Sequence, residues 1–204
     1  MVNRALLLCT SVLALVACSG GGTGSGSTAG SSGGSSGTAH GSTTTGGSSG
    51  GSTSGTSAGS ATVTGTILGA SFTPQDAISE VSSSSTFVVL TSYSGVCALA
   101  MADPNASKAN SSTLVFDFSG GATARAFSAP NDVDAQFANF DATCGSPSGE
   151  SASGGTVTVT RADATGIDGT FDLFMDSATT GHITGTFSAP TCAAPASDGG
   201  FSCR

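Results

Sequence analysis

The chain has 204 residues, of which 13 are acidic and 5 basic, so it carries a net charge of −8 at pH 7. A protein this acidic has no basic surface for the phosphates of nucleic acids, and the composition therefore excludes nucleic-acid binding. Glycine, serine and threonine crowd into residues 19–60, whereas all 11 phenylalanines lie after residue 60. This division predicts a tether followed by one globular domain.

Residues 1–17 are expected to be an export signal. Arg4 supplies a positive charge, and residues 5–16 are almost wholly apolar; the run is too short to cross a bilayer but has the size of a signal-peptide core. The tetrapeptide Leu15-Val16-Ala17-Cys18 follows and resembles the lipobox of bacterial lipoproteins. The resemblance implies that Cys18 is lipidated on its sulfur, becomes the mature N-terminus and is N-acylated. An ordinary secretory signal cleaved near Ala17 is the alternative.

The residue after the lipobox cysteine indicates which membrane a bacterial lipoprotein is sorted to. It is Ser19 rather than an aspartate, which by the sorting rule of that family implies transfer to the outer membrane. Several acyl chains make a stable anchor, since each buried methylene contributes about 0.8 kcal/mol. The sequence leaves open whether the domain faces the periplasm or the outside.

Residues 18–60 comprise the lipidated cysteine and a flexible tether. After Cys18 this segment contains only Ser, Gly, Thr and Ala apart from His40. It cannot bury enough apolar surface to offset the entropy lost on ordering, so it is expected to be disordered. A Gly/Ser chain of about 42 residues has an r.m.s. span of roughly 35 Å, which lets the domain stand clear of the lipid headgroups.

Residues 61–204 are expected to form one all-β domain, because short apolar-rich segments alternate with turn residues throughout. The expected strands cover residues 62–68, 71–73, 77–81, 86–93, 112–119, 122–128 and 133–143, followed by three strands between residues 155 and 190. One short helix is expected at residues 96–103, where Pro104 ends it. About eight or nine strands with a meander-like C-terminal half indicate an antiparallel β-sandwich or a flattened barrel.

The clearest strand pattern lies at residues 155–190, where apolar and polar residues alternate. Odd-numbered side chains are expected to face the core and even-numbered ones the solvent, with Phe174 as the exception. A turn at residues 163–165 would place Val159 opposite Gly169. A second turn at residues 177–181 would place Leu173 opposite Gly185.

A five-residue pattern, apolar-x-Gly-Thr-apolar, occurs at residues 63–67, 167–171 and 183–187 and predicts similar strands of one sheet. Two of these copies lie in GTVTVTRADATGIDGTFDLFM and GHITGTFSAPTC. These segments resemble the terminal hairpins of small all-β domains in uncharacterised lipoproteins of Gram-negative bacteria. The resemblance implies a fold and an envelope location, and it carries no catalytic residues.

Four cysteines lie in the domain, at Cys97, Cys144, Cys192 and Cys203. An even number in an exported chain favours two disulfides, with three possible connectivities. The tail after the last expected strand is short and polar, which favours a local bridge from Cys192 to Cys203 and leaves Cys97 with Cys144. A zinc site is the alternative, but the chain has no Cys-x-x-Cys pair, so we expect neither a metal nor a cofactor.

The candidate chemical groups are one histidine and two sets of carboxylates. His182 is expected to face Asp176, and such a pair is either two-thirds of a catalytic triad or a solvated cross-strand contact. Asp132 with Asp134, and Asp168 with Asp172 and Asp176, could bind calcium or act as paired acids. Neither set matches a calcium-binding loop, and aspartates on an outer face also prevent pairing between sheet edges.

These observations support three functional hypotheses. The first is a non-enzymatic outer-membrane lipoprotein, anchored in the membrane through Cys18, whose domain binds a protein or glycan partner. The second is a carrier of a small apolar ligand, with a barrel cavity lined by Phe116, Phe118, Phe171 or Phe187. The third is a hydrolase that uses His182 and nearby carboxylates.

Overall fold

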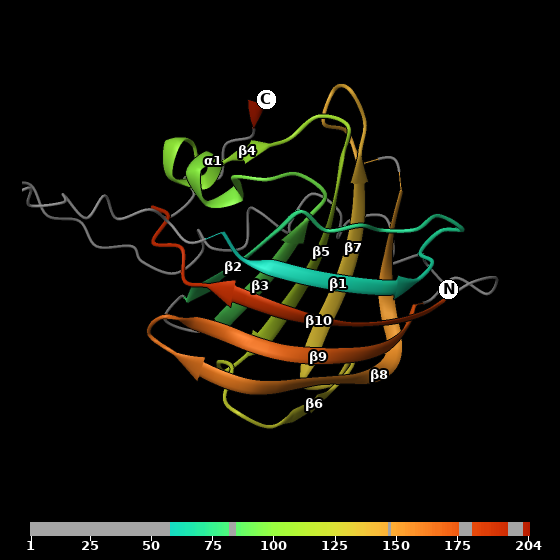
Figure 1. Cartoon of the computed structure of the whole chain (residues 1–204). Coiled ribbons are helices and arrows are strands. Elements are labelled where there is room, and N and C mark those ends of the chain that lie inside the picture. The colour runs from blue at the N-terminus through green and yellow to red at the C-terminus, as the bar shows by residue number, and fades with distance from the viewer. Residues whose placement is uncertain (1–57, 82–84, 147, 176–180, 196–201) are drawn as a thin grey trace, which may run out of the picture. The chain divides into compact units, whose positions relative to one another are not determined.

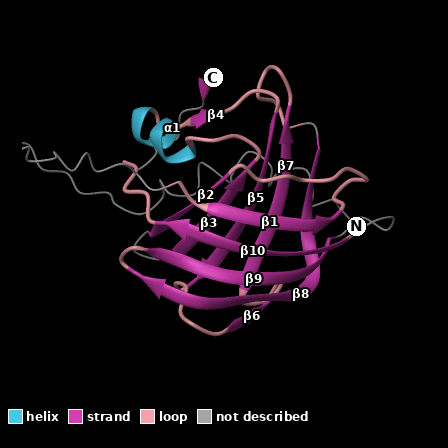
Figure 2. Ribbon diagram, viewed as in Figure 1, coloured by secondary structure: helices cyan, strands magenta, loops and turns pink. Residues whose placement is uncertain are grey.

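The structure, a computed structural model, describes residues 58–81, 85–146, 148–175, 181–195 and 202–204. Figure 1 and Figure 2 show that strands make up most of this part and that its helix is short. The elements are β1 (Ser60–Gly65), β2 (Asp76–Val81), β3 (Ser85–Thr91), α1 (Val96–Ala102), β4 (Ala106–Ser107), β5 (Ser111–Ser119), β6 (Ala126–Ser128), β7 (Val133–Phe140), β8 (Ser148–Asp163), β9 (Gly166–Met175), β10 (His182–Pro190) and β11 (Ser202–Cys203). The expectation of an all-β domain with one short helix is confirmed.

Nine of these strands form one sheet in the order β1-β10-β9-β8-β7-β5-β3-β2, with β6 paired to β8. The long strand β8 pairs with β7 through residues 148–151 and with β9 through residues 152–163, and it carries an irregularity between Ala152 and Gly154. A bulge of this kind bends a strand and increases its twist. As a result β1, β10 and β9 cross in front of β3, β5 and β7 (Figure 1).

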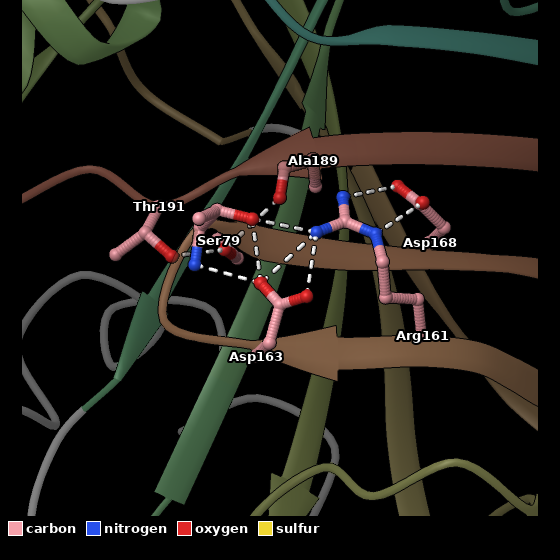
Figure 3. A network of polar contacts seen from close by, with 7 residues as sticks. Ser79, Arg161, Asp163, Asp168, Ala189 and Thr191 are labelled. Carbon is pink, nitrogen blue, oxygen red and sulfur yellow. Dashed lines mark hydrogen bonds and ion pairs between the residues drawn. The ribbon is translucent and has the colours of Figure 1, made fainter.

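The two ends of the sheet meet beside β2 and nearly close it into a barrel. Ser79 of β2 forms a parallel bridge with Thr191, just after β10, and its carbonyl accepts the N–H of Cys192 at 2.8 Å. The Ser79 hydroxyl donates to the carbonyl of Ala189 at 3.1 Å (Figure 3). These contacts satisfy polar groups that an open edge would leave to solvent.

Phenylalanine rings fill the core of the barrel. Phe116 packs against Phe171 and Phe187 with ring centroids 5.3 and 5.5 Å apart, and Phe118 packs against Phe127 at 4.8 Å. All five rings are buried. The rings that were expected to line a ligand cavity therefore pack on one another instead.

The repeated five-residue pattern has a packing role. Its three copies lie on β1, β9 and β10, with β10 between the other two, which confirms that they are strands of one sheet. Gly185 lies opposite Phe171, and a Cβ there would come within 2.4 Å of that ring. Gly169 lies opposite Phe187 in the same way, with 2.6 Å between a Cβ and the ring. The copies on β9 and β10 thus each provide a ring and the space for the other's ring.

The register between β9 and β10 differs from the expected one by two residues. Leu173 lies opposite Ile183 rather than Gly185. A shift of two residues leaves every side chain on its expected face, so the odd-numbered residues are indeed the buried ones. The expected pairing of Val159 with Gly169 is confirmed.

The disulfides join Cys97 to Cys192 and Cys144 to Cys203. The expected pairs, Cys192 with Cys203 and Cys97 with Cys144, are therefore wrong. The reason is the path of the tail: β11 pairs in parallel with β4, which brings Cys203 to the region that follows β7. The tail is thus joined to distant parts of the domain rather than closed on itself.

Candidate functional site

A pocket of about 310 Å³ lies on the outer face of β2, β3 and β5, outside the barrel core. Its walls come from those strands, from α1, from the segment between α1 and β5, and from the tail after β10. The lining side chains are mostly apolar, and they include Ile78, Val81, Phe87, Val89, Val96, Leu99, Ala100, Pro104, Ala106, Val115, Phe140, Ala193, Ala194 and Pro195. Pockets of this size and character are common sites for small ligands.

The pocket lies over β3, a strand that is apolar on both faces. On β3, Val88 and Leu90 point into the barrel core while Phe87 and Val89 face the pocket. On β5, Val115 faces the pocket, whereas its neighbours Leu114 and Phe116 are buried in the core. A strand that is apolar on both faces has to be covered on both. A second, smaller core of Ile78, Val96, Cys97 and Cys192 provides part of that cover.

The helix contributes one face to the pocket. Val96, Leu99 and Ala100 line it, and their spacing of three and four residues places them on one side of α1. Ala98 and Met101 lie on the other side and are exposed. Figure 1 shows α1 and β4 close together at one end of the domain.

A buried carboxylate positions this helix. Asp76, only 3% exposed, accepts the N–H of Gly95 at 2.8 Å and that of Val96 at 3.1 Å on one oxygen. Its other oxygen accepts the N–H groups of Gly59 and Ala77 at 3.1 and 2.9 Å. Asp76 therefore joins the chain before β1, the start of β2 and the start of α1 at one point. Sequence analysis missed this role, because a single aspartate before an apolar strand also reads as a loop residue.

Covalent and polar links hold the cover in place. The disulfide between Cys97 and Cys192 joins α1 to the tail. Asp103, directly after α1, accepts hydrogen bonds from Ser202 and Arg204 near the C-terminus. These bonds, led by the one from Ser202, lower the pKa of the Asp103 carboxyl. The pocket is therefore bounded by segments that are fixed at several points.

Polar side chains make up the rest of the lining, namely Glu80, Thr91, Tyr93, Ser107, Lys108, Ser111, Thr113 and Thr191. Burial changes the acid–base behaviour of two of them. Burial raises the pKa of the Glu80 carboxyl. Burial and the charge of Asp76 together raise the pKa of Tyr93 to about 12, so its hydroxyl stays protonated at neutral pH. Lys108 also borders the pocket and is exposed. The site thus offers a mostly apolar surface with several polar side chains.

The structure places His182 away from this pocket, on the outer face of β10. Its Nε2 lies 2.7 Å from Oδ1 of Asp172 on β9, and its ring stacks on Phe174 with centroids 4.8 Å apart. The expected partner, Asp176, lies outside the described residues. Asp172 is 63% exposed, so this pair lies on the open surface and lacks the buried carboxylate of a catalytic triad.

The other expected carboxylate groupings have structural partners. Asp132 accepts the N–H of Ser128 at 3.1 Å, and Asp134 accepts the side-chain N–H of Gln136 at 2.6 Å. Asp134 also lies opposite Asp117 on β5; burial, and then the charge of Asp134, raise the pKa of Asp117. Among the described residues, no group of three or more His, Cys, Asp or Glu side chains is arranged to hold a metal ion.

Asp168 belongs to an ion-pair network rather than to a carboxylate cluster. Arg161 donates to both of its oxygens, at 2.6 and 3.0 Å, and also to Asp163 at 3.0 Å (Figure 3). The bond from Arg161 lowers the pKa of Asp168. Hydrogen bonds from Thr165, followed by the one from Arg161, lower the pKa of Asp163 to about 2. The network lies at the turn between β8 and β9, so we assign it a structural role.

Comparison with known proteins does not identify the chain. No protein-family model, no curated protein and no solved structure matches it. The anchor expected at Cys18 and residues 19–57 of the expected tether lie outside the described residues, whereas Ser60 already belongs to β1. In the part that is described, no helix has the length and apolar character needed to cross a membrane. We therefore infer function from the pocket.

Proposed function

We propose that this protein is a non-enzymatic lipoprotein of the outer membrane whose domain binds a small apolar ligand in the pocket beneath α1. The observation that supports this proposal is a pocket of about 310 Å³ with mostly apolar walls, while the other candidate groups that the structure describes have structural partners. The volume lies at the lower end of the range for ligand pockets, so it suits a small ring system or a short acyl chain.

The walls favour a preformed site. The two disulfides and the four hydrogen bonds to Asp76 fix the cover before a ligand arrives. A preformed site loses little conformational entropy on binding, which leaves more of the hydrophobic free energy for affinity. Binding would remove both ligand and lining side chains from water, which is the main favourable term for an apolar ligand.

The proposed anchor and tether give the site a location. A tether of about 40 residues lets the domain sample a zone roughly 35 Å from its point of attachment. Apolar small molecules in an envelope partition into membranes. A pocket on a tethered domain would therefore bind such a molecule close to the membrane surface. The expected membrane anchor and the apolar pocket are consistent with each other in this way.

Titration with the neutral fluorescent probe N-phenyl-1-naphthylamine tests ligand binding. The mature chain from Ser19, exported behind an ordinary signal, carries the disulfides without acyl groups and allows work without detergent. We expect saturable binding and a loss of tenfold or more, which is about 1.4 kcal/mol, in Ala100→Trp, because the indole occupies the pocket.

Ala98→Trp is the matched control, since Ala98 lies on the same helix but is exposed and does not line the pocket. It should bind the probe as the unchanged chain does. Equal binding by both variants, or no saturable binding by the unchanged chain, would rule out this site. Circular dichroism melting of both variants shows whether either loses binding through unfolding.

A further inference from the structure

A second surface, on the outer face of β8, β9 and β10, carries an exposed aromatic ring among hydroxyl groups. Phe174 is 53% exposed, although its neighbours on this face are polar. Next to it on this face lie Ser153, Thr156, Asp172 and Thr184, and Thr158, Thr170 and Thr186 continue the hydroxyl-bearing surface one step further along the strands. This face is separate from the apolar pocket, which lies on the outer side of β2, β3 and β5.

On its β10 side, the ring of Phe174 packs against the ring of His182. His182 lies directly opposite it on β10, and the two rings stack with centroids 4.8 Å apart and planes 19° from parallel. The Nε2 atom of His182 in turn lies 2.7 Å from Oδ1 of Asp172. An aromatic ring fixed in this way loses little side-chain entropy when a ligand stacks on it.

On its β8 side, Phe174 lies next to a position without a side chain, and we call the space over that position the slot. The residue opposite Phe174 on β8 is Gly154, and among the described residues a Cβ at Gly154 would meet no atom within 4 Å. The next residue, Gly155, brings the backbone of β8 close to that of β9, since a Cβ there would lie 2.2 Å from the carbonyl oxygen of Asp172. The slot therefore has an aromatic wall and a backbone floor.

Among the described residues, the carboxylates of Asp168 and Asp172 on this face have partners. Arg161 binds both oxygens of Asp168, and His182 contacts Asp172. The described part of this face thus has no group of metal-ligating side chains, and the net charge of −8 disfavours anionic ligands. Carboxylate and hydroxyl oxygens next to an exposed ring match a neutral ligand that presents C–H groups on its face and hydroxyl groups at its edge.

We propose that this slot binds neutral glycans, with one pyranose ring stacked on Phe174 and its hydroxyl groups bonded to Asp172 and the neighbouring threonines. The glycan chain would lie along the hydroxyl-bearing face. This site is independent of the apolar pocket, so either can exist without the other. A single aromatic platform at an exposed site gives weak binding, and a chain of several sugars strengthens it through repeated contacts.

Saturation-transfer NMR on the full mature chain, in micelles of a detergent without sugar groups, tests this site. The probes are cellohexaose, maltohexaose and the fully N-acetylated form of chitohexaose at millimolar concentration, all of which are neutral, with tetramethylammonium as a cationic comparison. We expect transfer to the ring protons of at least one oligosaccharide. Phe174→Ala, which removes the ring, and Gly154→Leu, which fills the slot, should each weaken binding about fivefold or more.

Met101→Ala is the control, because Met101 is also 53% exposed but lies on α1; it should leave binding unchanged. Saturating N-phenyl-1-naphthylamine should not displace the oligosaccharide, which separates this site from the pocket. The proposal is overturned if no oligosaccharide binds, if the two slot variants bind as the unchanged chain does, or if only tetramethylammonium binds.

Discussion

Replacing Asp76 by asparagine is expected to lower the free energy of unfolding by about 3 to 5 kcal/mol. The carboxylate accepts four backbone N–H groups, two on each oxygen, and is closed off from water. Asparagine keeps one acceptor oxygen and turns an NH₂ group toward the remaining N–H donors. Those N–H groups then have no acceptor. The free-energy cost of an unpaired N–H is largest where water cannot replace the lost partner.

Urea denaturation followed by circular dichroism measures this effect, and the melting temperature should fall by roughly 10 °C. Asp132→Asn is the matched control, because that carboxylate accepts a single backbone N–H from Ser128 at the surface. It should lose under about 1 kcal/mol. Similar losses in the two variants would show that Asp76 does not join the three segments as described.

Removing the bridge between Cys97 and Cys192 by a double change to alanine is expected to cost about 4 to 5 kcal/mol. The two residues are 95 positions apart, and a cross-link over so long a loop strongly restricts the unfolded chain. The same change should also weaken probe binding in the pocket, because α1 is no longer tied to the tail. A double variant as stable as the unchanged chain would contradict this expectation.

The connectivity itself has a direct test by peptide mapping without reduction. Trypsin cleaves the domain after Lys108, Arg125 and Arg161, so Cys97 and Cys144 fall in separate fragments and the other two cysteines share the last fragment. The observed pairing predicts a complex of three linked fragments. The pairing expected from the sequence predicts that the last fragment is released alone. A second cleavage before Asp198 separates Cys192 from Cys203 and assigns each bridge.

The faces of the C-terminal strands could be predicted, but their register could not. Alternation decides which side chains point inward, and this holds for Phe171, Leu173 and Ile183. A shift of two residues leaves the alternation intact, so the pattern alone cannot distinguish the two registers. The observed register is the one that places each phenylalanine ring over a glycine of the neighbouring strand, as with Phe171 and Gly185.

The pocket and the disulfides could not be predicted because both depend on where the tail lies. Four cysteines allow three connectivities, and only the pairing of β11 with β4 brings Cys203 toward Cys144. The same tail covers the outer face of β2. A signal for the pocket does exist in the sequence, since the run TFVVLT has apolar residues on both faces of one strand, and such a strand needs two covers.

Phe174 stands out in the sequence as an apolar residue on the outward face, where a cover by a loop or a second sheet would be expected, and the structure instead leaves it 53% exposed. Its contact with His182 follows from the register. The pairing of His182 with Asp172 likewise follows from strand geometry, because the two lie on neighbouring strands of one face. A histidine near carboxylates in a β-rich sequence is therefore weak support for catalysis until its exposure is known.

The most direct test of ligand binding is to isolate the protein from the membrane fraction of its own host and to identify by mass spectrometry the apolar compounds that organic solvent extracts from it. Ala98→Trp and Ala100→Trp, isolated in parallel, provide the comparison. A small apolar compound present in near-equal amount with the unchanged protein and with Ala98→Trp, and absent from Ala100→Trp, is the predicted result. The same extract from all three proteins would contradict the proposal that the pocket beneath α1 is a ligand site.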